Sequence, residues 1–334
     1  MNLISKNLLV TGGAGFIGSN FIKYLLSKYN NLKIINLDAL TYAGNLNNLK
    51  SIEKNPNYKF IQGDICDKDL VNDIFLKNQI DGVINFAAET HVDNSILNPD
   101  VFVRTNVNGV FNLLNVAYNF WMKNPFQVKN KFKLARFHQI STDEVYGSID
   151  KGSFTEQSRY APNSPYSASK ASADMIVRSF NRTYGLNTTI SISSNNFGPN
   201  QNNEKFIPTI INSIINNKPI PVYGDGKNIR DWISVEDHCS AIDLIFNNSI
   251  SGQIYNVGGC NELTNLEIIQ KIHQAIINIK SEYSNNDLKI QFIKDRYGHD
   301  RRYSLDISKI KKDLNWCKLT DFNESIIKMI TCYL

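Results

Sequence analysis

The feature that most constrains how this chain folds is a glycine-rich segment near its start, VTGGAGFIGS at residues 10–19. The apolar residues before it predict a strand, and those after it carry apolar side chains at helical spacing. Gly12, Gly15 and Gly18 fit the spacing G-x-x-G-x-x-G, and Gly13, Gly15 and Gly18 fit G-x-G-x-x-G. Glycines let the backbone turn tightly and approach a pyrophosphate, which then lies at the positive N-terminus of the helix. Such turns are common, so the pattern alone is weak evidence for a dinucleotide site.

An acidic residue further along supports the dinucleotide interpretation. Asp38 ends a second expected strand, KIINLD at 33–38, twenty residues after Gly18. A carboxylate there accepts hydrogen bonds from a ribose 2′-hydroxyl and repels a 2′-phosphate. Because no Arg flanks Asp38 in NLDALTY, the sequence predicts NAD rather than NADP. The alternative is a purely structural loop followed by a strand-end Asp.

The first half of the chain alternates strand and helix patterns. Strands are expected at 7–12, 33–38, 58–65, 81–88 and 133–141, and helices at 15–29, 68–79 and about 101–121. This alternation predicts an α/β fold of the Rossmann type, a doubly wound parallel sheet with helices on both faces. After about residue 195, Asn, Pro and Gly become frequent and the elements shorten. We therefore expect an NAD-binding domain with the catalytic residues over 1–194 and a smaller substrate-binding lobe over 195–334, with 188–196 and 252–259 returning to the sheet.

Composition limits the remaining classes of function. The net charge of +5 over 334 residues is mild, and no Lys/Arg cluster is dense enough to indicate nucleic-acid binding. No leader-like apolar segment precedes the first strand, and no stretch approaches the roughly 18 apolar residues of a membrane span. We expect a cytoplasmic protein without a membrane anchor. The five cysteines lack a C-x-x-C pair and are expected to be buried free thiols in a reducing compartment: Cys66, Cys239, Cys260, Cys317 and Cys332.

The segment STDEVYG places a hydroxyl and two acids at the end of an expected strand. Thr142, Asp143 and Glu144 are consecutive. Two carboxyls in a closed site cannot both ionise cheaply, so one of them would be held protonated as a proton donor. The alternative is a solvated acidic turn.

A third motif, YSASK, places Tyr166 and Lys170 four residues apart and therefore on one helix face. An ammonium beside a phenol favours the phenolate, so we expect a lowered Tyr166 pKa and a base near neutrality. Lys170 can also bind the nicotinamide ribose. The same spacing occurs by chance in many surface helices, but downstream of the glycine loop and Thr142 it indicates oxidation of a sugar alcohol.

These motifs together carry a family resemblance. TGGAGFIGS, LDALTYAGN, AAETHVDNS, STDEVYG, YSASKAS, SNNFGPNQNNEKFIP, GDGKNIRDW and DRYGHDRRY occur in the order found in nucleotide-sugar 4,6-dehydratases, over nearly the whole chain. The chain thus resembles this branch of the extended short-chain dehydrogenase/reductase superfamily, which includes dTDP-glucose and UDP-glucose 4,6-dehydratases. The T-D-E triplet is the most specific part, since the related 4-epimerases lack the two acids.

The resemblance implies a mechanism. Bound NAD oxidises C4 of the glucosyl unit, Glu144 removes the acidified C5 proton, and Asp143 protonates the departing C6 hydroxyl. Thr142 and Tyr166 hold the C4 oxygen, and hydride returns to C6. The product is a 4-keto-6-deoxy sugar nucleotide on the way to rhamnose or other deoxysugars. The resemblance also implies a homodimer through helix 101–121 and the helix bearing Tyr166. Alternatives are a 4-epimerase or simple sugar oxidoreductase, and a non-catalytic dinucleotide-binding protein.

Further contacts carry over residue by residue, with no metal expected. Asn94 and Tyr297 depart from the dTDP-type pattern, where Arg and Pro are usual, and leave the choice between thymine and uracil open. The implied cofactor contacts are Gly12, Gly15, Phe16, Ile17, Gly18, Asp38, Ala39, Leu40, Thr41, Asp64, Ile65, Phe86, Ala87, Ala88, Thr90, Thr105, Tyr166, Lys170 and Asn196. The implied substrate contacts are Thr90, Thr142, Asn195, Lys205, Phe206, Pro221, Val222, Tyr223, Arg230, Asn265, Arg296 and His299.

Overall fold

A seven-stranded parallel sheet organises the molecule. The structure, a computed structural model, describes residues 5–285 and 288–334. The strand order places β1 between β4 and β2. The chain therefore adds β2 and β3 on one side of β1, and then β4, β7, β8 and β12 on the other. Ligands bind beyond the carboxyl ends of the strands at such a reversal. The predicted Rossmann-type fold is confirmed. In spatial order the strands are β12 (Ile254–Val257), β8 (Thr188–Ser193), β7 (Arg136–Thr142), β4 (Gly82–Asn85), β1 (Asn7–Thr11), β2 (Lys33–Asp38) and β3 (Tyr58–Gln62).

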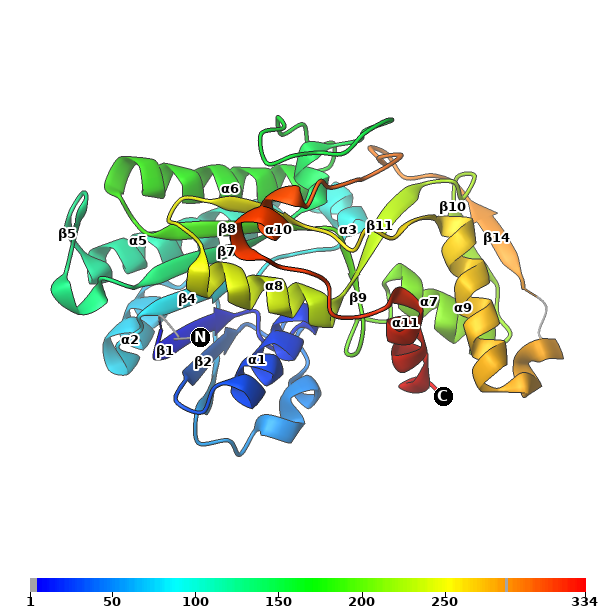
Figure 1. Ribbon diagram of the computed structural model, residues 1–334, viewed down its shortest axis with the longest axis horizontal. Helices are drawn as coiled ribbons and strands as arrows, with labels where there is room; N and C mark the ends of the chain where they lie inside the picture. The colour runs from blue at the N-terminus through cyan, green and yellow to red at the C-terminus, as the bar shows by residue number, and fades with distance from the viewer. Residues whose placement is uncertain (1–4, 286–287) are drawn as a thin grey trace.

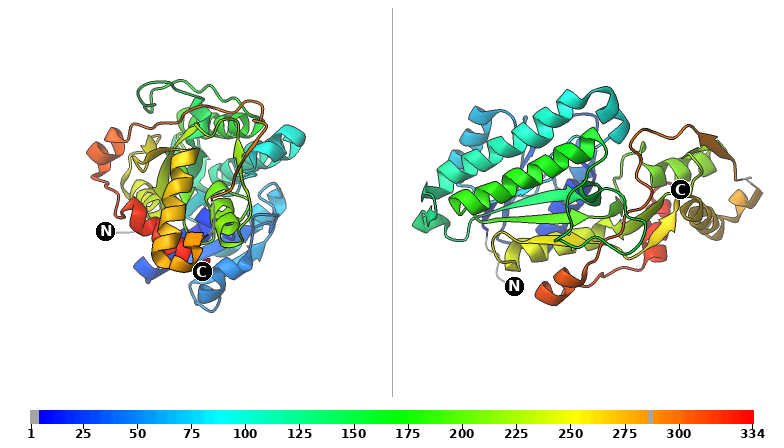
Figure 2. Two further views of the ribbon diagram at one scale, coloured as in Figure 1. Left: turned by 90° about the vertical axis from the view of Figure 1, so that its right-hand side faces the viewer. Right: turned by 90° about the horizontal axis from the view of Figure 1, so that it is seen from above.

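Helices cover both faces of this sheet (Figures 1 and 2). Helices α1 (Phe16–Lys28) and α8 (Val235–Asn248) lie on one face, where Phe21 and Ile22 pack into a buried cluster with Leu8 and Val10. Helices α2 (Lys68–Asn78), α5 (Val110–Trp121) and α6 (Pro165–Tyr184) lie on the other. Because both faces are covered, the central strands are buried almost throughout, although β7 and β8 carry many polar side chains. Strand β7, for example, is buried along all but its last residue.

The helix expected from residue 101 is a composite. Helix α4 (Pro99–Phe102) runs through a π-helical turn, η2 (Val103–Gly109), into α5. The long helix that bears Tyr166 is α6, whose first turn is closed by a capping box between Ser164 and Ser167 with Pro165 at the first helical position. Figure 2 shows α5 and α6 side by side along one flank.

The second half of the chain builds a smaller lobe with a core of its own. Helices α7 (Phe206–Ile215), α9 (Asn265–Ile279) and α11 (Phe322–Thr331) pack beside the parallel pair β10 (Ile220–Tyr223) and β14 (Ile290–Ile293). Between the lobe and the main sheet lies a second, three-stranded sheet of β9 (Asn195–Phe197), β11 (Ile229–Ser234) and β13 (Glu262–Thr264) (Figure 1). The division at residue 195 stays a prediction. The remaining elements are η1 (Leu46–Ile52), α3 (Val92–Leu97), β5 (Met122–Asn124), β6 (Gln127–Val128), η3 (Asn130–Phe132), η4 (Asp143–Tyr146), η5 (Ser281–Asn285) and α10 (Ser308–Leu314).

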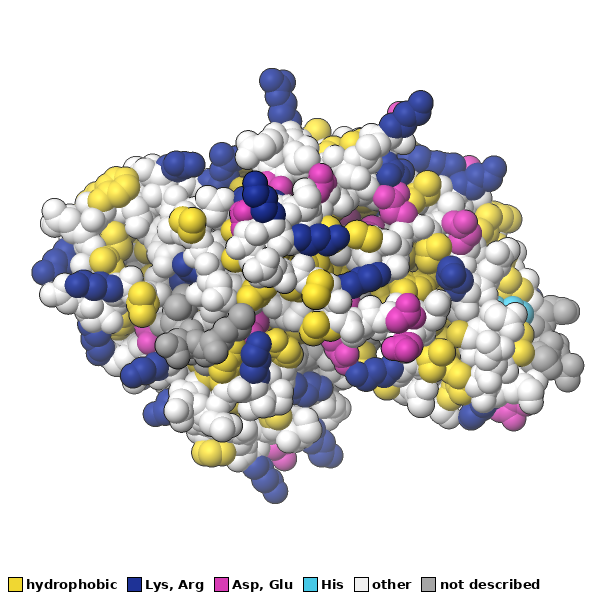
Figure 3. All heavy atoms as spheres, in the orientation of Figure 1, with side chains coloured by type: hydrophobic (Ala, Val, Ile, Leu, Met, Phe, Trp, Pro, Cys, Tyr) yellow, Lys and Arg dark blue, Asp and Glu magenta, His cyan; other side chains and the backbone are white. Residues whose placement is uncertain are grey.

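The surface mixes both signs of charge, and Figure 3 shows basic and acidic side chains interspersed on one face. Within residues 5–285 and 288–334, no helix has the length and apolarity to cross a membrane, and no group of three His, Cys, Asp or Glu side chains is arranged to hold a metal. One expectation was wrong. All five cysteines are free, but Cys239 alone is buried, and Cys260, Cys317 and Cys332 are exposed.

Candidate active site

A cavity of about 710 Å³ opens at the carboxyl ends of β1, β2, β4 and β7, where the strand order reverses. The glycine loop, the acid pair and the Tyr–Lys pair come together around it. The predicted site residues that line the cavity are Gly12, Gly15, Phe16, Ile17, Gly18, Asp38, Ala39, Thr41, Asp64, Ile65, Phe86, Ala87, Ala88, Thr90, Thr105, Thr142, Asp143, Glu144, Tyr166, Lys170, Asn195, Asn196 and Lys205.

The glycine loop leaves no room for side chains. Gly12 has φ +67°, and a Cβ added there would lie 2.6 Å from the backbone N of Ala87. A Cβ on Gly18 would lie 2.4 Å from the carbonyl O of Gly12. Since both obstacles are backbone atoms, only glycine fits at these two positions. The loop thereby presents bare backbone to the cavity at the start of α1, as a pyrophosphate site requires.

Asp38, the last residue of β2, accepts a hydrogen bond from the glycine loop. Its Oδ2 accepts from the Ala14 amide and its Oδ1 from the Leu40 amide, both at 2.8 Å. Burial raises the Asp38 pKa and these two hydrogen bonds oppose that rise. A carboxylate has about four acceptor positions, so two remain for ribose hydroxyls. The loop and Asp38 therefore fit NAD. Leu40 contributes its amide to Asp38 and does not line the cavity.

The acid pair lies where β7 turns into η4. Thr142 begins the turn, and its Oγ1 accepts from the Glu144 amide at 3.4 Å and donates to Oδ1 of Asp143 at 3.3 Å. Asp143 is 2% exposed, and within the described residues its Oδ2 has no hydrogen-bond partner. A buried carboxyl oxygen without a partner is costly unless it is protonated or meets a ligand. The solvated acidic turn is thereby excluded.

The two acids stand in different electrostatic surroundings. Burial, and then the charge of Glu144, raise the Asp143 pKa well above its ordinary range. Burial also raises the Glu144 pKa, but cationic side chains oppose that rise, first Arg296 and then Arg230. Asp143 therefore holds its proton more tightly than Glu144, whose ionised form the two cations favour.

Tyr166 and Lys170 face the acids from α6. Lys170 is 5% exposed and its Nζ donates to the carbonyl O of Ile140 at 2.7 Å. Burial lowers the Lys170 pKa to about 8. Contrary to expectation, the Tyr166 pKa is raised well above its ordinary value, because burial and the charge of Glu144 both disfavour the phenolate. The protein alone therefore keeps the Tyr166 phenol neutral.

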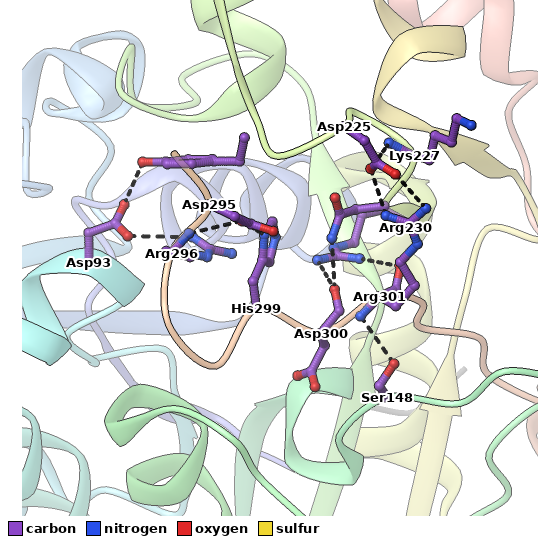
Figure 4. Close-up of polar contacts among 12 residues, drawn as sticks. Asp93, Ser148, Asp225, Lys227, Arg230, Asp295, Arg296, His299, Asp300 and Arg301 are labelled. Carbon is purple, nitrogen blue, oxygen red and sulfur yellow. Dashed lines mark hydrogen bonds and ion pairs between the residues drawn. The ribbon is translucent and has the colours of Figure 1, made fainter. Parts of the chain in front are cut away.

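Several predicted substrate residues do not line the cavity and form a second cluster of polar contacts (Figure 4). Tyr223 donates from its hydroxyl to Oδ2 of Asp93 at 3.1 Å, and Arg296 lies 4.0 Å from Oδ1 of the same carboxylate. Nδ1 of His299 lies 2.6 Å from Oδ1 of Asp295. Through Asp93 this cluster links α3 to Tyr223 at the end of β10 and to Arg296.

Arg230 lies deepest in the second cluster. It is 6% exposed, donates from Nη2 to the carbonyl O of Asp300 at 2.9 Å, and stacks 4.2 Å above the ring of Tyr303. Its charge also lowers the pKa of both Asp143 and Glu144. The position suits an anion that lies between the second cluster and the two acids.

Four other predicted substrate residues lie outside the cavity wall. Val222 is 0% exposed within the core of the lobe, so its side chain cannot reach a ligand. Phe206 packs against the same core, and Pro221 is exposed on β10. Asn265 begins α9, and its amide donates to the carbonyl O of Asn228 at 3.1 Å.

The cavity is also lined by polar residues that the sequence did not single out, among them Tyr42, Glu89 and Glu204. The Tyr42 hydroxyl lies 3.2 Å from Oγ1 of Thr90, and Oε1 of Glu204 lies 3.6 Å from Nζ of Lys205. Each of the three adjoins a residue that was predicted, which was the one signal available.

Comparison with known proteins agrees with the family resemblance that the sequence motifs carry. The model of the GDP-mannose 4,6 dehydratase family matches residues 9–329. The chain is 45% identical to a dTDP-glucose 4,6-dehydratase of Neisseria gonorrhoeae, over 98% of this chain and 96% of that one, and 46% identical to one of Haemophilus influenzae, over 98% of each. Among solved structures, the dTDP-glucose 4,6-dehydratase DesIV of Streptomyces venezuelae, with NAD bound, superposes with a TM-score of 0.88 at 40% identity, over 98% of this chain and 96% of that one. A UDP-glucose 4-epimerase of Thermotoga maritima reaches a TM-score of 0.85 but only 26% identity, over 98% of each chain.

Proposed function

Because this chain belongs to the GDP-mannose 4,6 dehydratase family, we propose that its substrate is dTDP-glucose and that Asp143 and Glu144 carry the elimination. The chain is an NAD-dependent nucleoside-diphosphate-glucose 4,6-dehydratase. It converts the glucosyl unit to a 4-keto-6-deoxy sugar with loss of water. When bound, NAD would accept hydride from C4 and return it to C6.

The observation that carries the assignment of roles is the different surroundings of the two adjacent acids. Glu144 faces cations and is the group that ionises, so it removes the proton from C5. Asp143 is buried beside that charge and stays protonated, so it donates a proton to the departing C6 hydroxyl. Thr142 and Tyr166 hold the C4 oxygen. The carbanion left at C5 is stabilised by the C4 ketone, and water leaves from C6.

The second cluster, which contains Arg230 and Arg296, suits the nucleoside diphosphate. Arg230 and Arg296 present guanidinium groups, which match phosphate oxygens in a bidentate fork. Both lie close enough to Glu144 to lower its pKa. A diphosphate between them would place the attached sugar at the acids.

Product analysis tests this function. Purified protein incubated with dTDP-glucose should give a product that has lost one water and carries a C4 ketone by mass spectrometry and NMR. UDP-glucose is the parallel substrate. Formation of dTDP-galactose, or of a C4 ketone that retains the C6 hydroxyl, would contradict the proposal.

We also propose a homodimer through α5 and α6. Phe111 on α5 is 50% exposed and Met175 on α6 is 43% exposed, so each of the two helices presents an exposed apolar side chain. Phe111 lies edge-on to Phe180 with ring centroids 6.1 Å apart, which ties the two helices together. Sedimentation of the wild type should give a dimer, and Met175→Glu should give a monomer. We place the protein in the cytoplasm, a reducing compartment in which exposed free thiols such as Cys260 persist.

A further inference from the structure

A buried carboxylate, Asp174, lies one helical turn beyond Lys170 on α6. It is 0% exposed, and its Oδ2 accepts from Oγ of Ser141 at 2.5 Å and from the hydroxyl of Tyr160 at 3.2 Å. Within the described residues, its Oδ1 has no hydrogen-bond partner. A carboxylate held this deep by two neutral hydroxyls destabilises the fold unless a charge nearby compensates for it.

The compensating charge is that of Lys170. Positions four apart share one helix face, and Lys170 is itself buried with its Nζ on a backbone carbonyl. The other titratable groups around Asp174 are Arg178, one turn further along α6, and Tyr160 and Tyr146, whose rings meet edge-on at 5.3 Å. Both tyrosine pKa values are raised by burial, so these phenols stay neutral. The charged row along α6 is therefore Lys170, Asp174 and Arg178.

We propose that Asp174 is a positioning residue that keeps Lys170 protonated, and thereby supplies the cation that Tyr166 needs to take the proton from the C4 hydroxyl. The inference rests on the proposed roles of Tyr166 and Lys170. Asp174 lies behind the cavity wall rather than in it, so it acts through Lys170 and not on the substrate.

The direction of the effect follows from the surroundings of each group. Burial lowers the Lys170 pKa to about 8, and the charge of Asp174 opposes that fall. Burial raises the Asp174 pKa to about 6, and the charge of Lys170 opposes that rise. Both are therefore charged between about pH 6 and pH 8. Without the carboxylate, Lys170 would lose its proton at a lower pH. Tyr166 would then face Glu144 and Asp143, both of which raise its pKa, with no cation beside it.

Asp174→Asn is the direct test, since it removes the charge and keeps the shape. The alkaline limb of the kcat–pH profile should move to lower pH. At pH 9, above the Lys170 pKa of about 8, kcat should fall on the order of tenfold for a shift of one pKa unit, because the charged fraction there changes by about that factor. KM for dTDP-glucose should stay within about twofold, because Asp174 does not touch the substrate. Tyr160→Phe is the matched control, because it removes one hydrogen bond to the carboxylate and leaves its charge; its alkaline limb should not move.

A second readout does not depend on turnover. The pKa of the Lys170 ammonium, followed by NMR of carbon-13-labelled lysine with Lys170→Met to assign the signal, should be lower in Asp174→Asn than in wild type. Active wild type with an unmoved alkaline limb and an unmoved Lys170 titration in Asp174→Asn would overturn the inference. Wild type inactive on dTDP-glucose would instead overturn the proposed function. Should Asp174→Asn fail to fold, Asp174→Ser removes the same charge with a smaller neutral side chain. Its alkaline limb should also move to lower pH, and an unmoved alkaline limb would contradict the inference.

Discussion

Replacing Asp38 separates its contribution to cofactor binding from its contribution to the fold. Its Oδ2 accepts the buried Ala14 amide and its Oδ1 the half-buried Leu40 amide, both at 2.8 Å. In Asp38→Ala these two N–H groups lose their partner, and each unsatisfied buried donor costs about 1–3 kcal/mol. Asp38→Asn keeps one acceptor and should lose about half as much. Either change also removes the charge-assisted hydrogen bond to the ribose, worth about 1–3 kcal/mol, so NAD should bind about 5- to 150-fold more weakly.

The assay is calorimetric titration of NAD and NADP into cofactor-free protein, with unfolding followed in urea. The matched control is Asp67→Ala, which removes an exposed N-cap whose carboxylate accepts from the Leu70 amide at 3.0 Å, outside the cavity. It should cost about 0.5–2 kcal/mol of stability and leave NAD affinity unchanged. Unchanged NAD affinity in Asp38→Asn, or wild-type protein that yields chiefly NADP on extraction, would refute the reasoning.

Three further predictions concern the acids and the nucleotide. Asp143→Asn should slow loss of the C6 hydroxyl while C4 is still oxidised, so the absorbance of the reduced cofactor at about 340 nm should accumulate on mixing. Glu144→Gln should suppress exchange of the C5 hydrogen with solvent. Wild-type turnover in both variants would show that the roles are wrong. Glu144 must be ionised and its pKa is raised, so kcat should fall with decreasing pH, with a midpoint above the ordinary pKa of a Glu side chain. An acid limb with its midpoint at or below that ordinary pKa would count against the assignment. Thymine and uracil differ by one methyl, worth about 1–3 kcal/mol in a hydrophobic pocket, so UDP-glucose should be a substrate with a preference of degree, and a purine nucleotide glucose turned over equally fast would contradict this.

The sheet could be predicted from local sequence patterns, and so could the glycine loop, Asp38 and the Tyr166–Lys170 pair of the site. The spacing of Gly12, Gly15 and Gly18 reports a backbone constraint, and the structure shows what it is: at Gly12 and Gly18 a side chain would collide with backbone. Asp38 and the Tyr166–Lys170 pair follow from position in a strand and on a helix face. The strands β8 and β12 were also expected in the sheet and lie there.

The rest depends on contacts between distant segments, which a local pattern does not contain. The rise in the Tyr166 pKa comes from burial and from Glu144, and the spacing of Tyr166 and Lys170 reveals neither. Tyr42 enters the site through its contact with Thr90, a residue of another loop. The burial of Val222 in the lobe core follows from how β10 packs against helices far along the chain.

The most direct test of the dehydratase mechanism is the fate of a label at C4. With dTDP-glucose deuterated at C4, the label should appear at C6 of the product, and a mixture of labelled and unlabelled substrate should show little crossover. In heavy water, solvent deuterium should enter at C5, delivered through Glu144. An epimerase would return the label to C4, and a simple dehydrogenase would release it with the cofactor. Label recovered at C4 or in released cofactor would contradict the account, and label at C6 is the result that it predicts.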